Sequence, residues 1–207
     1  YVKNITNNDN NNEVLNEHRT GLRPMSAEDL RTARENNTLK VLGDMGEPSD
    51  PDIDLTTNDA FPPIGDQGAE GSCTAWAETY YARTYHKAKA EGWDFSGKTY
   101  NTADKSKLMS PEFTYQLING GSDSGSNHLD AIQVNHHMGV ASLDTMPYND
   151  GTATIWGSEE AWRESVKYRT KGFGHEDVGY YLIIDSEKDI NTVKSLIAKD
   201  YVVTISV

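Results

Sequence analysis

Residues 61–76 read Phe-Pro-Pro-Ile-Gly-Asp-Gln-Gly-Ala-Glu-Gly-Ser-Cys-Thr-Ala-Trp, a turn rich in glycine and proline that runs directly into a helical pattern. From Cys73 to Glu91, apolar residues recur at the i, i+3, i+4 and i+7 spacing of one helix face, and Gly92 ends the pattern. These apolar residues are Cys73, Trp76, Ala77, Tyr80, Tyr81, Tyr85 and Ala88. The sequence therefore predicts a long helix that begins at Cys73 and is buried along one side.

The position of Cys73 suggests that its thiol is a catalytic nucleophile. A thiol in the first turn of a helix faces unpaired backbone N–H groups and the positive end of the helix dipole, an environment that favours the thiolate. Gly68 and Gly71 allow close approach of a substrate backbone, and the amide of Gln67 can donate to an oxyanion beside the Cys73 N–H. Alternatively, Cys73 is a small apolar residue on the buried face. The residues alone leave both interpretations open.

The run Gln67–Ala75 resembles the Gln-Gly-x-x-Gly-Ser-Cys-x-Ala signature of the papain-like (family C1) cysteine peptidases. The likeness extends over about residues 53–207, and it is closest to secreted bacterial members. Besides the cysteine motif, the segments that carry the likeness are Ile53–Leu55 with the following FPPIGDQG, Ser110–Phe113, Asn119–Gly121, Gly125–Ser126 and Thr145–Tyr148.

The resemblance assigns roles to individual residues. It implies that Cys73 is the nucleophile and that the side chain of Gln67 contributes to the oxyanion hole. Gly125 resembles the glycine that hydrogen-bonds an extended substrate like an added strand. The other residues expected to contact substrate are Gly71, Ser72, Ser126 and His128, with Ser206 as a further pocket residue. Glu70 and Thr74 depart from the family, which usually has a disulfide cysteine and a tryptophan at these positions.

The family's general-base histidine and its orienting asparagine follow a strand that resembles residues 201–207, YVVTISV. The resemblance therefore places both groups beyond Val207, on a continuation of the chain or on a second chain cut from the same precursor. In the second case the protein is a heterodimer. None of the chain's own histidines is expected to accept the proton: His18, His86, His128, His136, His137 and His175.

The order of the predicted elements indicates an α+β protein, which the resemblance narrows to a papain-like two-lobed fold. Residues 53–207 would form its helical lobe and part of its β-rich lobe, and residues 1–52 a propeptide-like N-terminal extension that could shield the cleft. Further helices are expected from Ser26, Ser110, Asn127 and Ser158 and over 188–198, with Ile190, Val193, Leu196 and Ile197 facing inward. Strands are expected over 178–184 and 201–207.

Composition excludes several classes of function. The chain has 207 residues and a net charge of −13, which disfavours a nucleic-acid-binding protein. No apolar run approaches the roughly 20 residues that span a bilayer. A single cysteine rules out an intramolecular disulfide framework. The spacing of potential ligands predicts no metal site and no cofactor. A Ca²⁺ ion at the loop around Asp123 is a weaker alternative. A second acidic stretch, with Asp50, Asp52 and Asp54, alternates like a calcium loop but lacks the remaining features of one.

Together these features predict an extracellular or cell-surface cysteine endopeptidase, made as a zymogen, that cleaves peptide or protein substrates through a thioester on Cys73. The alternative is a non-catalytic binding or cell-surface module that kept the papain-like fold. The absence of the histidine and asparagine from these residues favours this alternative.

Overall fold

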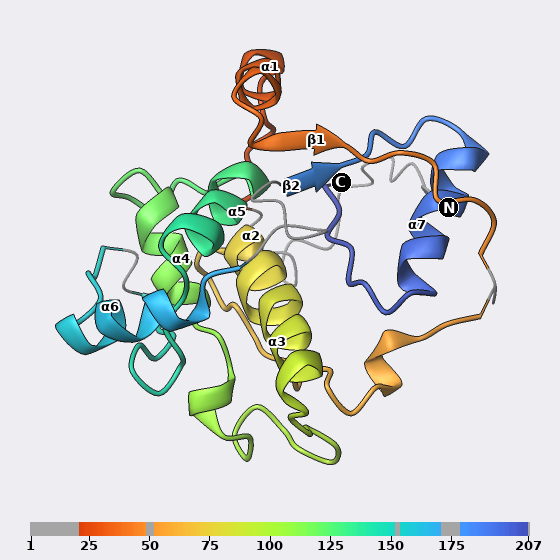
Figure 1. Ribbon diagram of the computed structural model, residues 1–207. Coiled ribbons are helices and arrows are strands. Elements are labelled where there is room, and N and C mark those ends of the chain that lie inside the picture. The colour runs from red at the N-terminus through yellow and green to blue at the C-terminus, as the bar shows by residue number, and fades with distance from the viewer. Residues whose placement is uncertain (1–20, 49–51, 152–153, 171–178, 207) are drawn as a thin grey trace, which may run out of the picture.

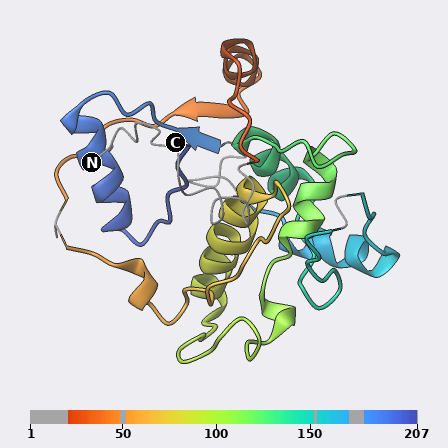
Figure 2. The ribbon, with the colours of Figure 1, turned by 180° about the vertical axis from the view of Figure 1, so that it is seen from behind.

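The computed structural model describes residues 21–48, 52–151, 154–170 and 179–206. Within these ranges the strands are β1 (Leu39–Val41) and β2 (Gly179–Tyr181), and short 3-10 helices occupy Leu55–Thr57, Lys105–Lys107 and Val166–Tyr168. The α-helices are α1 (Ala27–Glu35), α2 (Cys73–Ala75), α3 (Thr84–Glu91), α4 (Pro111–Ile118), α5 (His128–His137), α6 (Glu159–Ser165) and α7 (Glu187–Ile197). Helices α4 and α6 lie on one side of the central helix and α7 on the other (Figure 1), and the view from behind shows the same order reversed (Figure 2).

The predicted long helix is confirmed. It runs without interruption through α2, a π-helix at Trp76–Arg83, and α3, and it ends at Gly92, which has a left-handed φ of 68°. The π-helix was not predicted, because its wider turns leave no separate mark in an apolar pattern of this length. The expected face is still buried: Trp76, Tyr80, Tyr85 and Ala88 belong to one hydrophobic cluster.

The helices that pack against α2 and the π-helix begin where the sequence places their caps. Ser110 accepts a hydrogen bond from the Phe113 N–H, with Pro111 in the first turn of α4. Asn127 caps α5, and Ser158 caps α6 in the same way. A cluster of Ala75, Tyr115, Ile118, Ala131 and Val134 joins α2, α4 and α5. These contacts place the start of the central helix beside the loop that connects α4 to α5.

The two strands pair in parallel, with Leu39 opposite Gly179 and Val41 opposite Tyr181. Of the strand predicted over 178–184, residues 179–181 are confirmed, residues 182–184 lie outside β2, and Val178 lies outside the described residues. The predicted strand over 201–207 is absent from its described part, residues 201–206. There Val202 packs against the aromatic cluster of the central helix instead of pairing with a strand.

Helix α7 confirms the predicted helix over 188–198, but the expectation for its inner face is wrong in part. Ile190 is 45% exposed, whereas Thr192 and Ser195 are buried. The reason is that α7 packs against the irregular segment around Gly46, whose carbonyl accepts a hydrogen bond of 2.7 Å from the Ser195 hydroxyl. Polar contacts with a neighbouring backbone therefore decide which face of α7 is covered.

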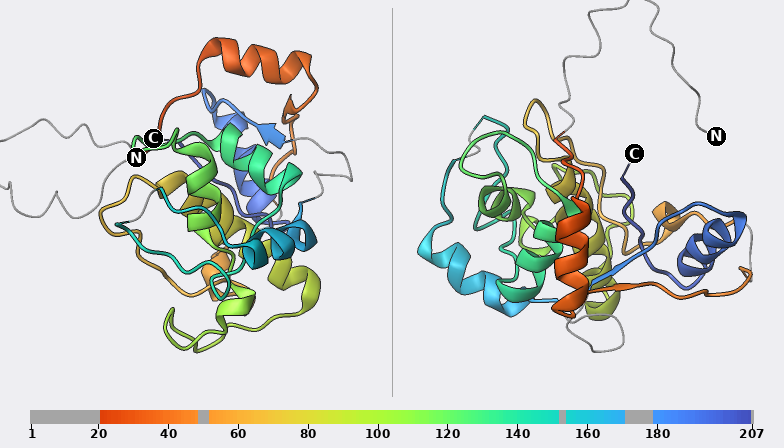
Figure 3. Two further views of the ribbon diagram at one scale, coloured as in Figure 1. Left: turned by 90° about the vertical axis from the view of Figure 1, so that its left-hand side faces the viewer. Right: turned by 90° about the horizontal axis from the view of Figure 1, so that it is seen from above.

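The N-terminal part of the described chain begins with an extended segment and α1. Helix α1 starts at the expected Ser26 with a capping box, in which the side chains of Ser26 and Asp29 each accept a hydrogen bond from the other residue's backbone N–H. Seen from above, α1 lies between the side that carries α6 and the side that carries α7 (Figure 3). Residues of α1 and α5, among them Thr32 and Gln133, line the same shallow pocket.

Candidate active site

The loop that precedes the central helix is held in a tight turn. Gly68 has a left-handed φ of 59°, and its N–H donates to the Asp66 carboxylate at 2.8 Å. A Cβ atom on Gly71 would lie 3.0 Å from the Asp123 Oδ1 atom, which is closer than nearly all real Cβ contacts. Both glycines are therefore required by the turn itself, Gly68 for its backbone angle and Gly71 for close packing.

Cys73 is the first residue of the central helix and carries a half-buried free thiol. The preceding Ser72 makes no side-chain capping bond to the helix. Its hydroxyl instead lies 2.7 Å from the hydroxyl of Tyr148. The thiol therefore sits at the N-terminal end of the central helix, which Ser72 leaves without a side-chain cap.

Gln67 is fixed at both of its ends. Its backbone carbonyl accepts a hydrogen bond of 2.6 Å from the Tyr148 hydroxyl, and its amide Nε2 donates to the Glu70 carbonyl at 2.8 Å. The side chain predicted for the oxyanion hole is thus held on the same short loop that leads to Cys73.

The loop between α4 and α5 carries Gly125 and Ser126, which were predicted to form a substrate rim. Ser126 pairs through both of its backbone groups with an extended N-terminal segment: its N–H donates to the Gly21 carbonyl and its carbonyl accepts from the Arg23 N–H, each at 2.7 Å. The pairing is parallel, with Leu22 opposite Ser126. The Gly125 N–H instead donates to the Tyr115 hydroxyl at 3.2 Å. Ser126, rather than Gly125, is therefore the residue whose backbone pairs with an added strand in this structure.

Asp123 connects the cysteine loop to this rim, a role that the sequence did not predict. Its Oδ1 atom accepts hydrogen bonds from the Gly71 N–H at 2.8 Å and from the Tyr115 hydroxyl at 2.7 Å. Since Tyr115 also accepts from Gly125, one carboxylate orders both sides of the rim. No local motif marks such a residue, because its two partners lie 52 and 8 positions away in the chain.

The possibility of a Ca²⁺ site gains no geometric support from the described residues, which hold no group of three His, Cys, Asp or Glu side chains able to bind a metal. Asp54 caps the 3-10 helix Leu55–Thr57 through hydrogen bonds to Thr56, and these bonds lower the pKa of its carboxyl. Asp50 lies outside the described residues.

His128 begins α5 as expected, and its Nδ1 atom lies 2.7 Å from the Glu78 carboxylate. The same carboxylate oxygen accepts from the Thr204 hydroxyl at 2.6 Å. His128 and Ser206, both predicted to line a pocket, do line one cavity of about 650 Å³ with mostly apolar walls. The structure thus brings these two residues together, although 78 positions separate them in the sequence.

The other described histidines have structural surroundings. His86 is half-buried against Tyr201, and burial, together with the neighbouring Arg83, lowers its pKa. His136 contacts the Thr170 carbonyl through Nδ1 at 2.9 Å, and its ring packs against that of His137. His18 and His175 lie outside the described residues.

Glu70 is a second feature that the sequence did not reveal as functional. Its side chain is 1% exposed, and burial, reinforced by the nearby Glu112, raises the pKa of its carboxyl to about 7. Glu112 is 2% exposed, and burial also raises the pKa of its carboxyl. Two buried acids therefore act on each other, and one of them, Glu70, lies three residues before Cys73.

Comparison with solved structures shows the class of fold. A helical lobe with a few strands, built on a central helix, is the arrangement of the papain-like cysteine proteases. The chain is similar to Xylellain, a cysteine protease from Xylella fastidiosa, with a TM-score of 0.50 and 20% sequence identity over 78% of this chain and 63% of Xylellain. This chain thus spans less than two thirds of the length of Xylellain.

A second match is a structure from a study of antibody cross-reactivity between the mite allergens Blo t 1 and Der p 1, with a TM-score of 0.43 and 14% identity over 64% of this chain and 41% of that one. No family model and no curated protein matches the sequence. At these identities the comparisons show the fold alone. In the described part of the chain, no helix has both the length and the apolar character needed to cross a membrane.

Proposed function

We propose that this chain is the N-terminal portion of a papain-like cysteine endopeptidase. The observation that carries the proposal is the position of Cys73, a half-buried free thiol at the first residue of the central helix of a papain-like lobe. The fixed loop of Gln67 and the strand-pairing backbone of Ser126 add the two further functions that a peptidase of this kind needs, oxyanion stabilisation and substrate alignment.

In the proposed reaction the Cys73 thiolate attacks the carbonyl carbon of a peptide bond. The oxyanion that forms accepts hydrogen bonds from the Cys73 N–H and from the Gln67 amide. When the C–N bond breaks, the leaving amine takes a proton from an imidazolium, and a thioester remains on Cys73. Water, deprotonated by the same imidazole, then attacks the thioester and releases the carboxylic acid and the thiolate.

The imidazole of this scheme comes from outside the 207 residues. We expect it, with an asparagine that orients it, on a continuation of the chain or on a second chain from the same precursor. The cavity of His128 and Ser206, with residues 180–184 and 201–206 along it, is the face on which that remaining part would complete the β-rich lobe.

The N-terminal segment supports the proposal of a zymogen. Residues 21–23 use both backbone groups of Ser126 that a substrate strand would use. A Cβ atom on Gly21 would lie 1.7 Å from the Gly71 carbonyl oxygen, so the segment also lies directly against the cysteine loop. Residues 21–25 would have to leave before a substrate could pair with Ser126. A zymogen that is processed in this way fits an extracellular peptidase acting on peptide or protein substrates without a cofactor.

The same pairing also favours the alternative function, a non-catalytic module of papain-like fold that holds an extended peptide on Ser126. One experiment separates the two. The protein, together with the polypeptide that completes it and after removal of residues 1–52, is titrated with an epoxide that alkylates active-site thiols, and peptide hydrolysis is measured for the parent, Cys73→Ser and Glu160→Gln. Glu160 is a suitable control because its side chain is exposed on α6.

An endopeptidase predicts one epoxide per protein, attached to Cys73, and a loss of hydrolysis of at least a thousandfold in Cys73→Ser with none in Glu160→Gln. Hydrolysis that survives in Cys73→Ser would contradict the proposal. Peptide binding without hydrolysis or labelling would support the non-catalytic module.

A further inference from the structure

The buried acid Glu70 lies three residues before Cys73 and has an unusual environment. Its side chain is 1% exposed, and neither carboxyl oxygen has a hydrogen-bond partner among the described residues. A buried carboxylate without donors is strongly disfavoured, whereas a buried neutral acid carries its own O–H donor. The environment therefore selects the neutral form of Glu70.

The nearest hydroxyl donors are already committed. The Tyr148 hydroxyl donates its one hydrogen to the Gln67 carbonyl at 2.6 Å. The Ser72 hydroxyl lies 2.7 Å from the same Tyr148 oxygen, so it must be the donor in that contact. This chain of hydrogen bonds joins Ser72, directly before the nucleophile, to Gln67. An ionised Glu70 could accept a hydrogen bond from the Ser72 or Tyr148 hydroxyl only if that hydroxyl gave up its present contact in this chain.

The titratable groups that face Glu70 are acids and tyrosines. Glu112 approaches from α4 and Asp123 from the rim loop, and both oppose a negative charge on Glu70. The hydroxyls of Ser72 and Tyr148 are close enough to stabilise that charge, and they act in the opposite direction. The charge of Glu70 also acts on Tyr115. Within the described part of the chain, no basic group is among those that act on its charge.

We propose that Glu70 is a positioning residue that works as a neutral acid, and that its ionisation draws the Tyr148 hydroxyl away from Gln67 and displaces the oxyanion side of the cysteine loop. This inference rests on the proposed peptidase function. Glu70 touches no reacting atom in this scheme. It acts through Tyr148 and Gln67, so that the activity would be lost as the pH rises through the ionisation of Glu70.

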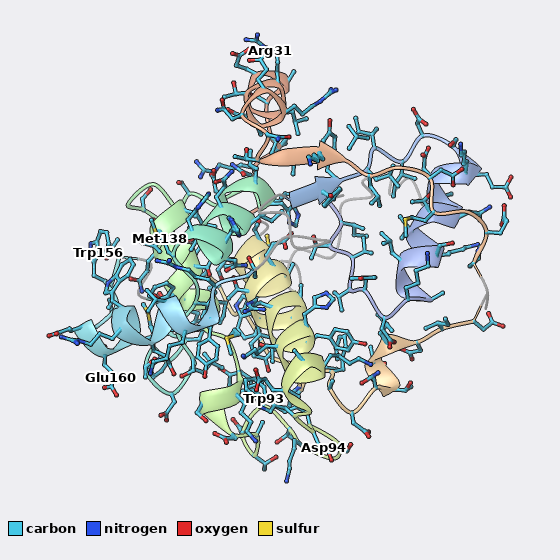
Figure 4. The ribbon with its side chains drawn as sticks, viewed as in Figure 1. Arg31, Trp93, Asp94, Met138, Trp156 and Glu160 are labelled. Atoms are coloured by element: carbon cyan, nitrogen blue, oxygen red, sulfur yellow. The ribbon has the colours of Figure 1, made fainter. Side chains whose placement is uncertain are left out.

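The decisive test compares the pH profile of kcat/KM of the assembled, activated protein with those of Glu70→Gln and two other variants. Glu70→Gln keeps the shape of the side chain and cannot ionise. Glu112→Gln removes one opposing charge, so that Glu70 should ionise at lower pH. Glu160→Gln is the control, since Glu160 points into solvent on the outer side of α6 (Figure 4).

We expect the parent to lose kcat/KM about tenfold per pH unit above an ionisation near 7. In Glu70→Gln this alkaline limb should disappear, with activity within about threefold of the parent at pH 5.5. The limb should move to lower pH in Glu112→Gln and stay in place in Glu160→Gln. An unchanged limb in Glu70→Gln would overturn the inference, and so would a folded but inactive Glu70→Gln.

A second measurement separates this inference from the peptidase proposal. The melting temperature is followed against pH for the parent and Glu70→Gln, which needs no activity. A difference in melting temperature between parent and variant that grows between about pH 4.5 and 7 supports a neutral Glu70. Equal melting temperatures at every pH overturn it. If epoxide labelling and hydrolysis both fail in the parent, the peptidase proposal fails, and with it the positioning role, whatever the melting curves show.

Discussion

Replacing Gly21 by alanine should release the N-terminal segment from the rim and expose the cysteine. A Cβ atom at this position would lie 1.7 Å from the carbonyl oxygen of Gly71 and 2.6 Å from the Gly71 Cα atom. Both are backbone atoms, which cannot rotate away as the end of a side chain can. The segment must therefore move, and it then loses the two hydrogen bonds that Ser126 makes with Gly21 and Arg23.

Each of these hydrogen bonds contributes about 0.5–1.5 kcal/mol net, so their loss weakens the bound segment by about 1–3 kcal/mol. At about 1.4 kcal/mol per factor of ten, the population with an open rim should rise roughly 5- to 150-fold. The assay is the rate at which a small thiol reagent alkylates Cys73 in the unprocessed protein, followed by the mass of the peptide that carries Cys73, the single cysteine of these 207 residues.

The matched control is Gly43→Ala in the same N-terminal extension, where a Cβ atom has nothing within 4 Å. Its alkylation rate should equal that of the parent. Equal rates for Gly21→Ala and the parent would refute the idea that residues 21–23 shield the cysteine. A rate increase in both variants would show instead that the extension is loosened in general, which also contradicts the proposed contact.

Three further predictions concern stability. Asp123→Ala removes the acceptor of the Gly71 N–H and should lower the free energy of unfolding by about 1–3 kcal/mol in urea titrations, while Asp123→Asn keeps an oxygen acceptor and should recover most of it. Because the pKa of Glu70 is raised, the folded protein holds a proton that the unfolded chain releases. The free energy of unfolding should therefore fall by up to about 3 kcal/mol from about pH 4.5 to 7. Glu70→Gln should abolish this fall in urea titrations at stepped pH. Tyr80→Phe leaves the buried Pro63 carbonyl without its 2.6 Å hydrogen bond and should cost about 1–2 kcal/mol, a loss that a calorimetric scan would detect.

Short sequence patterns predicted the parts of the fold that depend on residues close together in the chain. The central helix follows from the spacing of its aromatic residues, and the starts of α1, α4 and α6 follow from Ser26, Ser110 and Ser158, whose hydroxyls bind N–H groups three positions later. The position of Cys73 at the helix start follows from the same two signals, the glycine turn before it and the apolar period after it.

The remaining features depend on partners far away in the chain, which no local pattern contains. Strand β1 was not predicted, since its three residues pair only with β2, about 140 positions later. Ile190 was placed on the wrong face because a hydrogen bond to the Gly46 carbonyl, and not apolar burial, orients α7. The roles of Asp123 and Ser126 at the rim likewise appear only when the loops are assembled.

Strand β1 has a consequence for the release of the N-terminal extension. The extension is anchored twice, at Ser126 through residues 21–23 and at β2 through Leu39–Val41, and its later part also contacts α7 through Gly46. One proteolytic nick after residue 48 would break the covalent connection but neither anchor. The detached piece would then behave as a tightly associated peptide whose departure follows mass action, so that activation should become more complete on dilution and less complete when the free peptide is added back.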